Sequence, residues 1–313
     1  MSDNPKVLVT CPPMLGMIDE FRDEFSQRGM ELFAPTVRQT MSEEELIELL
    51  PNYDGWIIGD DPASSRVLEA GAAGNLRALV KWGIGTDNVD FDAAQRLGLP
   101  ISNTPGVFGK EVADLAMNYV SGLARQSFRI DREIRQDNGW PKPAGISLAG
   151  KTASLVGFGD IGRNTAKRLL AADMNVQVYD PSYAPFEGLN VQPLSWPEGL
   201  DKADFIIFTA PLNANTRHMF NPDLLPVVKL GVRIVNVGRG PLIDETALIE
   251  GLADGTIHSV ACDVFENEPL PFDSPLRAYP DNIFGSHNGS NTADAVSRVS
   301  HRAIELIDGF LNQ

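Results

Sequence analysis

Three polar side chains of different chemical types follow predicted strands in the second half of the sequence. Arg239, Glu268 and His287 each come shortly after a run of apolar, β-branched residues, the pattern of a buried strand. In an open sheet of parallel strands, ligands bind beyond the carboxyl ends of the strands. We therefore expect these three side chains to share one crevice.

These three groups together suit the oxidation of a 2-hydroxy acid and its reverse. A guanidinium can bind a substrate carboxylate and polarise an oxo group. An imidazole can exchange a proton with the hydroxyl, while a carboxylate orients that imidazole and holds it charged. Taken singly, Arg239 could be a surface cation and Glu268 could simply end a strand, so the prediction rests on the set. The remaining histidines, His218, His258 and His301, are interpreted as structural.

A glycine-rich loop indicates a dinucleotide cofactor. The segment Val156–Gly162 reads V-G-F-G-D-I-G and lies between an apolar strand and a helical stretch. Its glycines permit a tight turn and let backbone N–H groups and a helix N-terminus approach a pyrophosphate. The next strand ends at Asp180, and 180 − 162 = 18 residues is close to the spacing of the ribose-binding acid. A carboxylate there repels a 2′-phosphate, so NAD is expected rather than NADP. The competing interpretation is a glycine turn beside a strand-end acid.

The hydrophobic pattern alternates between strands and helices, which predicts α/β units with parallel sheets. The glycine loop and the three polar segments all follow strands of the second series. The expected strands are Val7–Thr10, a weaker one near Leu32, Trp56–Gly59, Ala78–Trp82, Thr152–Val156, Val176–Tyr179, Phe205–Thr209, Arg233–Val237, Val260–Val264 and Ile283–Phe284. The expected helices are Ile18–Gln27, Ser42–Leu50 (with Ser42 and Glu45 as a capping box), Arg66–Ala73, Glu111–Arg125, Ile161–Ala171 and Thr292–Leu311.

Composition narrows the classes of partner. The 313 residues carry 26 basic and 42 acidic side chains, a net charge of −16, which disfavours nucleic acid and anionic membranes. An acidic surface of this kind is also typical of adaptation to salt. No apolar run approaches the roughly 20 residues of a membrane span. The N-terminus lacks the pattern of a secretory signal. The two cysteines, Cys11 and Cys262, are expected to be reduced, and we expect a cytoplasmic enzyme without a metal.

With these motifs in hand, the sequence resembles the D-isomer-specific 2-hydroxyacid dehydrogenases, the group that includes phosphoglycerate dehydrogenase and the glyoxylate and hydroxypyruvate reductases. The likeness covers nearly the whole chain. It includes Lys81–Asp90, Asn103–Gly106, the glycine loop, Pro211-Leu212 with Thr216, and the three polar segments.

The resemblance implies roles for individual residues. Arg239 would bind the substrate carboxylate and oxo oxygen, His287 would be the acid–base group, and Glu268 would be its partner. Gly83, Ile84 and Gly85 would offer backbone N–H groups to the carboxylate. Trp82 is a candidate substrate contact, with core packing as the alternative. Asp263 would contact the nicotinamide carboxamide, and Thr216 the phosphates or ribose. The implied cofactor-binding residues are Gly157, Phe158, Gly159, Asp160, Ile161, Gly162, Asp180, Ala210, Pro211, Thr216, Val237, Gly238 and Asp263.

Two departures from the family pattern bear on the substrate and on the site. Phosphoglycerate dehydrogenases typically carry a basic residue after the third strand, whereas this chain has Asp60 and Asp61. Like-charge repulsion would oppose a phosphate, which favours an unphosphorylated substrate whose hydroxyls would donate hydrogen bonds to Asp60 or Asp61. The alternative is that Asp61 caps the next helix and faces water. Ser286 stands where the family usually has proline before the histidine.

We therefore expect two doubly wound α/β domains with the active site in the cleft between them. A flavodoxin-like substrate domain would comprise residues 1–102 and 289–313, and a Rossmann NAD-binding domain residues 103–288. The predicted enzyme interconverts a 2-oxo acid, such as hydroxypyruvate or glyoxylate, and a D-2-hydroxy acid. The alternatives are a D-3-phosphoglycerate dehydrogenase of serine synthesis and a non-catalytic NADH-sensing interaction protein. No regulatory domain is expected after the last helix. A homodimer through Glu111–Arg125 is expected.

Overall fold

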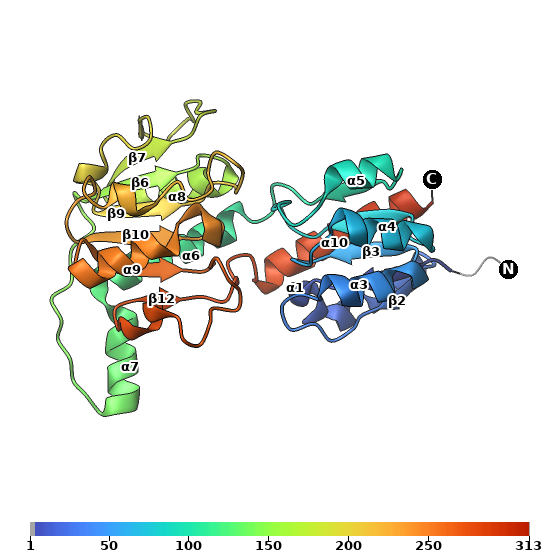
Figure 1. The fold of residues 1–313 in the computed structure, drawn as a ribbon. Coiled ribbons are helices and arrows are strands. Elements are labelled where there is room, and N and C mark those ends of the chain that lie inside the picture. The colour runs from blue at the N-terminus through green and yellow to red at the C-terminus, as the bar shows by residue number, and fades with distance from the viewer. Residues whose placement is uncertain (1–3, 313) are drawn as a thin grey trace. The chain divides into compact units, whose positions relative to one another are not determined.

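The structure, a computed structural model, describes residues 4–312 and contains two compact units (Figure 1). One unit comprises Met1–Phe108 and Asn291–Gln313, and the other comprises Gly109–Ser290. The sequence-based boundaries were 102/103 and 288/289. Each unit is described by itself below.

The first unit is a five-stranded parallel sheet in the order β2-β1-β3-β4-β5 with helices on both faces. This order is that of the flavodoxin-like doubly wound fold. The strands are β1 (Lys6–Val9), β2 (Glu31–Phe33), β3 (Gly55–Ile58), β4 (Ala78–Lys81) and β5 (Ile101–Asn103). The helices are α1 (Pro12–Leu15), α2 (Arg22–Gln27), α3 (Glu43–Leu49), α4 (Ser65–Ala73), α5 (Phe91–Arg96) and α10 (Ala293–Leu311).

The last helix, α10, packs on this first sheet, which is the place expected for it. Figure 1 shows it in red beside the blue strands, and it contacts β3 and β4. A Cβ at Gly55 of β3 would lie 3.1 Å from Ile307, so the missing side chain lets strand and helix approach closely. The opposite face of the sheet is covered by apolar residues of α3, α4 and α5. The capping box of Ser42 and Glu45 is confirmed at the start of α3.

The second unit is a seven-stranded parallel sheet in the order β12-β11-β10-β9-β6-β7-β8. The six strands β8-β7-β6-β9-β10-β11 follow the order of the Rossmann fold, and β12 adds a seventh strand beside β11. The strands are β6 (Thr152–Val156), β7 (Asn175–Tyr179), β8 (Gln192–Pro193), β9 (Phe205–Phe208), β10 (Val232–Asn236), β11 (Ile257–Cys262) and β12 (Ile283–Phe284). The helices are α6 (Gly109–Arg125), α7 (Ser127–Asp137), α8 (Asp160–Ala171) and α9 (Glu245–Asp254).

The apolar face of helix α6 is buried inside the second unit. It packs on α8 and on β10, β11 and β12, and Val112, Ala116, Tyr119, Val120 and Leu123 are buried there. The sequence argument for a dimer surface used this same apolar face, which is therefore already covered. Helix α7 instead extends away from the sheet of this unit (Figure 1).

Several short elements were not predicted from the sequence. They are α1, α5, α7, α9, β5 and β8. Their apolar periodicity is short or interrupted by charged residues, as in the S-F-R-I-D-R-E-I-R-Q-D sequence of α7. Tertiary contacts, rather than local pattern, decide such segments.

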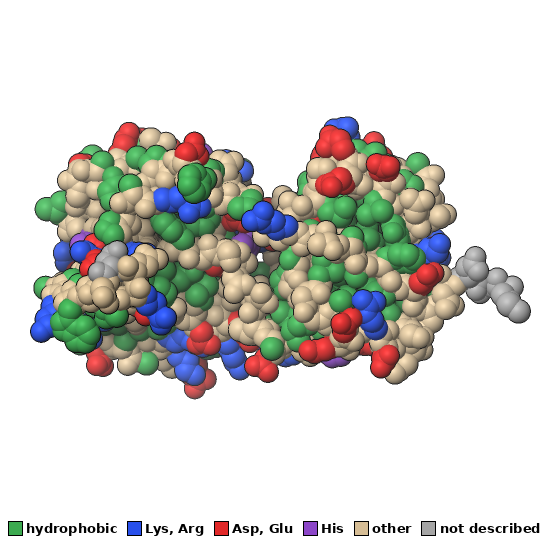
Figure 2. Space-filling view, turned by 90° about the horizontal axis from the view of Figure 1, so that it is seen from below, with side chains coloured by type: hydrophobic (Ala, Val, Ile, Leu, Met, Phe, Trp, Pro, Cys, Tyr) green, Lys and Arg blue, Asp and Glu red, His purple; other side chains and the backbone are tan. Residues whose placement is uncertain are grey.

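Charged side chains of both signs are interspersed on the surface seen in Figure 2, where Lys and Arg lie singly or in small groups among Asp and Glu. Among the described residues, no helix is both long enough and apolar enough to cross a bilayer.

A buried carboxylate holds the carboxyl ends of β1 and β3 together. Asp61 is fully buried and accepts hydrogen bonds from Thr10 Oγ1 at 2.5 Å, Met41 N at 2.8 Å and Gly59 N at 3.2 Å. Trp56 Nε1 in turn donates to Thr10 Oγ1. Burial raises the pKa of Asp61, while these donors oppose that rise. Both sequence-based interpretations of Asp61 were wrong, because Ser64 is the N-cap of α4 and no part of Asp61 faces water or a ligand.

We expect Asp61→Ala to lower the free energy of unfolding by about 2–4 kcal/mol, because it leaves several buried donors without an acceptor. Urea denaturation followed by circular dichroism measures this change. Asp19→Ala is the matched control, since the Asp19 side chain is 88% exposed, and it should change stability by no more than about 0.5 kcal/mol. Equal effects of the two substitutions would contradict a structural role for Asp61.

Candidate active site

The glycine loop after β6 has the geometry of a phosphate-binding turn. Gly157 has φ +94°, and a Cβ there would lie 2.7 Å from Ala210 N. A Cβ at Gly162 would collide with Gly157 O, whereas a Cβ at Gly159 would meet nothing within 4 Å. The first and third glycines thus allow close packing, and the second leaves open space at the N-terminus of α8. These features fit the pyrophosphate of a dinucleotide.

Asp180, directly after β7, is tied to this loop. Its carboxylate accepts hydrogen bonds from Phe158 N at 2.6 Å and Ser182 N at 2.8 Å. These bonds fix the carboxylate beside the glycine turn, where the ribose-binding acid is expected. Its ribose contact remains a prediction.

Asp160 brings a negative charge to the start of α8, where a pyrophosphate would also bind. Its carboxylate is turned toward the first residue of α6, since a Cβ at Gly109 would collide with both carboxylate oxygens. Asn164 Nδ2 also donates to it at 3.1 Å. The charge therefore lies at the N-terminus of α6, whose dipole favours an anion.

The loop after β9 packs on the glycine loop. Thr209 Oγ1 donates to the carbonyls of Val156 and Gly157, both at 3.0 Å, which holds Ala210 and Pro211 beside the turn. The Thr216 hydroxyl donates to Pro211 O and accepts from Asn213 N, each at 2.8 Å. Thr216 thus closes its own loop, and a contact with the cofactor remains a prediction.

Arg239 lies in a turn clamped by the last residue of β10. Asn236 Oδ1 accepts from Gly238 N at 3.1 Å, and Asn236 Nδ2 donates to Arg239 O at 2.9 Å. Arg239 Nη1 donates to Gly238 O at 2.9 Å, which orients the guanidinium at the carboxyl edge of the sheet. A Cβ at Gly240 would collide with the carbonyl of Phe265, so this turn packs directly on the loop that carries Glu268.

Glu268 and His287 form a hydrogen-bonded pair. Glu268 Oε2 lies 2.8 Å from His287 Nδ1, and Glu268 Oε1 accepts from Phe265 N at 2.9 Å. An ionised carboxylate only accepts, so Nδ1 is the donor and carries the ring proton that faces Glu268. Arg239, Glu268 and His287 therefore follow β10, β11 and β12, three neighbouring strands, as the sequence predicted.

The backbone of the His287 loop closes around Asp263. His287 has φ +56°, a left-handed conformation, and its N–H donates to Asp263 O at 2.7 Å. The next two N–H groups, of Asn288 and Gly289, donate to the Asp263 carboxylate at 3.2 and 2.8 Å. Tyr119 Oη of α6 donates to the same carboxylate at 3.4 Å. Burial raises the pKa of Asp263, and these donors oppose that rise.

Asp263 therefore has a structural role in addition to the nicotinamide contact implied by the resemblance. It accepts hydrogen bonds from three successive backbone N–H groups, and these bonds fix the conformation of the loop that carries His287. Although Ser286 replaces the proline usual in the family, His287 still pairs with Glu268, because Asp263 holds the loop. Tyr119 was not singled out from the sequence, since an apolar helix position gave no sign of a polar partner.

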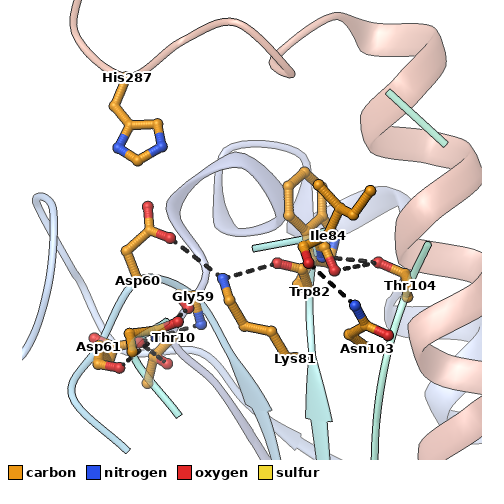
Figure 3. Close-up of polar contacts among 12 residues, drawn as sticks. Thr10, Gly59, Asp60, Asp61, Lys81, Trp82, Ile84, Asn103, Thr104 and His287 are labelled. Carbon is orange, nitrogen blue, oxygen red and sulfur yellow. Dashed lines mark hydrogen bonds and ion pairs between the residues drawn. The ribbon is translucent and has the colours of Figure 1, made fainter. Parts of the chain in front are cut away.

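In the first unit, the side chains of Asn103, which ends β5, and of Thr104, which follows it, orient the backbone after β4 (Figure 3). Thr104 Oγ1 donates to Gly83 O at 3.3 Å, and Asn103 Nδ2 donates to Ile84 O at 3.1 Å. Across a trans peptide the following N–H points the opposite way, so the N–H groups of Ile84 and Gly85 point away from β5. Gly83 N donates to Thr104 Oγ1 at 2.7 Å. Its N–H is thus used internally, and Ile84 and Gly85 remain the proposed donors to a carboxylate.

Trp82 belongs to the packing of the first unit. Its side chain is buried, its Nε1 donates to Ser300 Oγ of α10 at 3.1 Å, and its ring lies 5.2 Å from that of Phe108. These contacts match the core-packing interpretation better than the substrate contact.

Lys81, the last residue of β4, forms an ion pair that was not predicted from the sequence. Its Nζ lies 3.2 Å from Asp60 Oδ1 and donates to Trp82 O at 3.1 Å (Figure 3). The Lys81 side chain is 3% exposed and that of Asp60 37%. A lysine at the end of an apolar strand gave no sign of this partner, because the pairing joins residues 21 positions apart.

Comparison with known proteins identifies the family of this chain. The family described as D-isomer specific 2-hydroxyacid dehydrogenase, NAD binding domain, matches residues 117–289. A hydroxypyruvate reductase of Thermotoga maritima is 36% identical over 85% of this chain and 88% of its own length. A D-3-phosphoglycerate dehydrogenase of Archaeoglobus fulgidus is 32% identical over 94% of this chain, which spans only 55% of that protein.

The fold agrees with these sequence relatives. The crystal structure of a glyoxylate reductase from Paecilomyes thermophila superposes with a TM-score of 0.83 at 26% identity, covering 100% of this chain and 97% of that one. The chain therefore belongs to the D-isomer specific 2-hydroxyacid dehydrogenase family, and its Rossmann unit contains the NAD-binding domain of that family.

Proposed function

We propose that this enzyme reduces an unphosphorylated 2-oxo acid to the D-2-hydroxy acid with NADH, and that hydroxypyruvate and glyoxylate are candidate substrates. The observation that carries this proposal is the 2.8 Å pair of Glu268 and His287. A carboxylate-held imidazole is an acid–base group matched to the interconversion of an oxo and a hydroxyl oxygen. The Thermotoga maritima and Paecilomyes relatives, named as hydroxypyruvate and glyoxylate reductases, support the substrate class.

In the proposed reduction, Arg239 binds the substrate carboxylate and stabilises negative charge that develops on the oxo oxygen. His287, protonated and held by Glu268, gives its Nε2 proton to that oxygen. The N–H groups of Ile84 and Gly85 bind the carboxylate. NADH, when bound, supplies the hydride to the oxo carbon. The glycine loop would hold its pyrophosphate and Asp180 its adenosine ribose.

The second candidate is a D-3-phosphoglycerate dehydrogenase, which the Archaeoglobus relative represents. Lys81 is the feature that favours it, because an ammonium could attract a phosphate. Its pairing with Asp60 at 3.2 Å favours the unphosphorylated substrate instead. The sequence offers two carboxylates that could repel a phosphate, but Asp61 is buried, so only the Asp60 carboxylate supports this preference.

We further propose a cytoplasmic homodimer. Cys11 and Cys262 are both free thiols and buried, which agrees with a reducing compartment. Because the apolar face of α6 is covered, we assign the dimer contact to the adjoining α7 and the loop after it. There Phe128, Ile134 and Trp140 are 39%, 40% and 79% exposed.

Replacing His287 by Gln should lower kcat/KM for hydroxypyruvate reduction by about 10²–10⁴-fold, since the proton donor is lost. Glu268→Gln should lower it in the same direction, because the amide cannot hold an imidazolium as a carboxylate does. NADH absorbance measures turnover, and NADH fluorescence titration should show unchanged cofactor binding for both variants. Near-normal turnover of His287→Gln would remove it from the mechanism.

Asp180→Asn should reduce the preference for NADH over NADPH by at least about tenfold, because the repulsion of a 2′-phosphate is lost. The amide keeps an acceptor oxygen for one of the two loop donors, Phe158 N or Ser182 N. The ratio of kcat/KM for the two cofactors is the measurement. Glu250→Gln, on the exposed side of α9, removes one charge from the same unit and should leave the ratio unchanged. An unchanged ratio in Asp180→Asn would refute the ribose assignment.

Light scattering coupled to size exclusion should give the mass of two chains for the wild-type protein, whose chain is 34.0 kDa. The double variant Phe128→Glu with Ile134→Glu should elute as a monomer, because two charges would be buried in the contact. Leu230→Glu, at an apolar residue 78% exposed elsewhere on the unit, is the control and should remain dimeric. A monomeric wild type, or a dimeric double variant, would contradict this assignment.

A further inference from the structure

We propose that His218 is a positioning residue, whose imidazole holds Glu266 and thereby aligns the carboxylate of Glu268 with His287. This inference rests on the proposed function, because it adds a residue to the machinery of that reaction. From the sequence alone, His218 is interpreted as structural. Its contacts in the second unit connect that structural role to catalysis.

His218 joins three loops at the carboxyl edge of the second sheet. It lies in the loop after β9, and its backbone N–H donates to Pro241 O at 2.8 Å, in the segment after β10 that carries Arg239. Its ring Nε2 lies 2.5 Å from Glu266 Oε1, in the loop after β11 that carries Glu268. His218 has φ +51°, a left-handed conformation that is strained for a residue other than glycine. The surrounding structure must hold such a residue in place, and the bonds to the two other loops do so.

Glu266 is held at both its backbone and its side chain. Its backbone N–H donates at 3.0 Å to Oε1 of Glu245, the first residue of α9. An ionised Glu266 only accepts, so His218 Nε2 is the donor in the short contact between them. Burial raises the pKa of Glu245, and the nearby charge of Glu266 adds to that rise. The bond from His218 therefore opposes the repulsion that Glu245 exerts on the Glu266 side chain.

The position of Glu266 sets the position of Glu268. The N–H of Phe265, the preceding residue, donates to Glu268 Oε1 at 2.9 Å, so this loop folds back on itself. Glu268 Oε2 lies 2.8 Å from His287 Nδ1. A shift of the Glu266 backbone would move the Phe265 donor and turn the Glu268 carboxylate away from the imidazole. Hydrogen bonds weaken steeply as their geometry worsens, and a misplacement of about 1 Å can cost roughly 100-fold in rate.

The side chain and the backbone of His218 act on different loops. A Cβ at Gly240 would lie 2.5 Å from Glu266 N, so the Arg239 turn packs directly on the Glu266 backbone. This packing and the bond from His218 N–H to Pro241 O involve backbone atoms only, and they persist when the His218 side chain is replaced. Loss of the imidazole should therefore disturb Glu268 and leave the Arg239 turn in place. Because Arg239 binds the substrate carboxylate in the proposed reaction, we expect kcat to change more than KM.

Steady-state kinetics of NADH oxidation with hydroxypyruvate and glyoxylate test this assignment. His218→Leu should lower kcat by about tenfold or more, while KM for the 2-oxo acid stays within about threefold of the wild-type value. His218→Gln should restore kcat to within about threefold of wild type, because its amide N–H can donate to Glu266. Leucine and glutamine both carry a side chain at φ +51°, so the two variants share the backbone cost and differ in the donor.

A second variant and a control complete the design. Glu266→Ala should lower kcat by a factor similar to that of His218→Leu. The double variant should lose about as much as either single variant, since both changes break the same bond. His258→Leu is the control, because His258 lies near the amino end of β11, where its Nδ1 is 2.9 Å from Ser259 Oγ. This change should leave kcat at the wild-type value.

Three results would overturn the inference: a kcat of His218→Leu within about twofold of wild type, a His218→Gln variant as slow as His218→Leu, or losses that add in the double variant. An equal loss in His258→Leu would do the same, because it would show a general effect of replacing a histidine in this unit. A wild-type enzyme that reduces neither 2-oxo acid would instead overturn the proposed function.

Discussion

Parallel strand pairing turns the carboxyl ends of every strand toward one edge of the sheet, and both units of this protein depend on that constraint. In the second unit it collects Arg239, Glu268 and His287 from three successive strands, although 48 residues separate the first from the last. In the first unit it gathers Asp60 after β3 and the Lys81–Gly85 backbone after β4. The chemistry of each edge thus follows from the loops that the sheet brings together.

Backbone conformation, fixed by side chains that do no chemistry, is what aims these groups. Asp263 receives three successive N–H groups of the His287 loop through its carbonyl and carboxylate. Asn103 and Thr104 perform the same task for the backbone after β4 by occupying its carbonyls. In both cases a polar side chain of one loop saturates the main chain of the next. This leaves the reactive groups little conformational freedom, which is the condition for pre-organised catalysis.

An acidic protein that binds anionic ligands must oppose its own field locally. The chain does so by keeping carboxylates engaged where anions are expected. Asp160 turns from the glycine loop toward α6, Asp180 is held by two backbone donors, and Asp61 is buried in its own network. Asp60 is 37% exposed, and its carboxylate forms an ion pair with the buried ammonium of Lys81.

The amino-acid sequence by itself determined the α/β class, the glycine loop with Asp180, and the set of Arg239, Glu268 and His287, because each depends on local pattern and spacing along the chain. It did not reveal that Tyr119 meets Asp263, that Lys81 meets Asp60, or that Asp61 is buried. Nor did it show that Thr104 takes the N–H of Gly83. Those facts needed the tertiary structure, because hydrogen bonds and ion pairs between distant segments leave no periodic trace in the sequence.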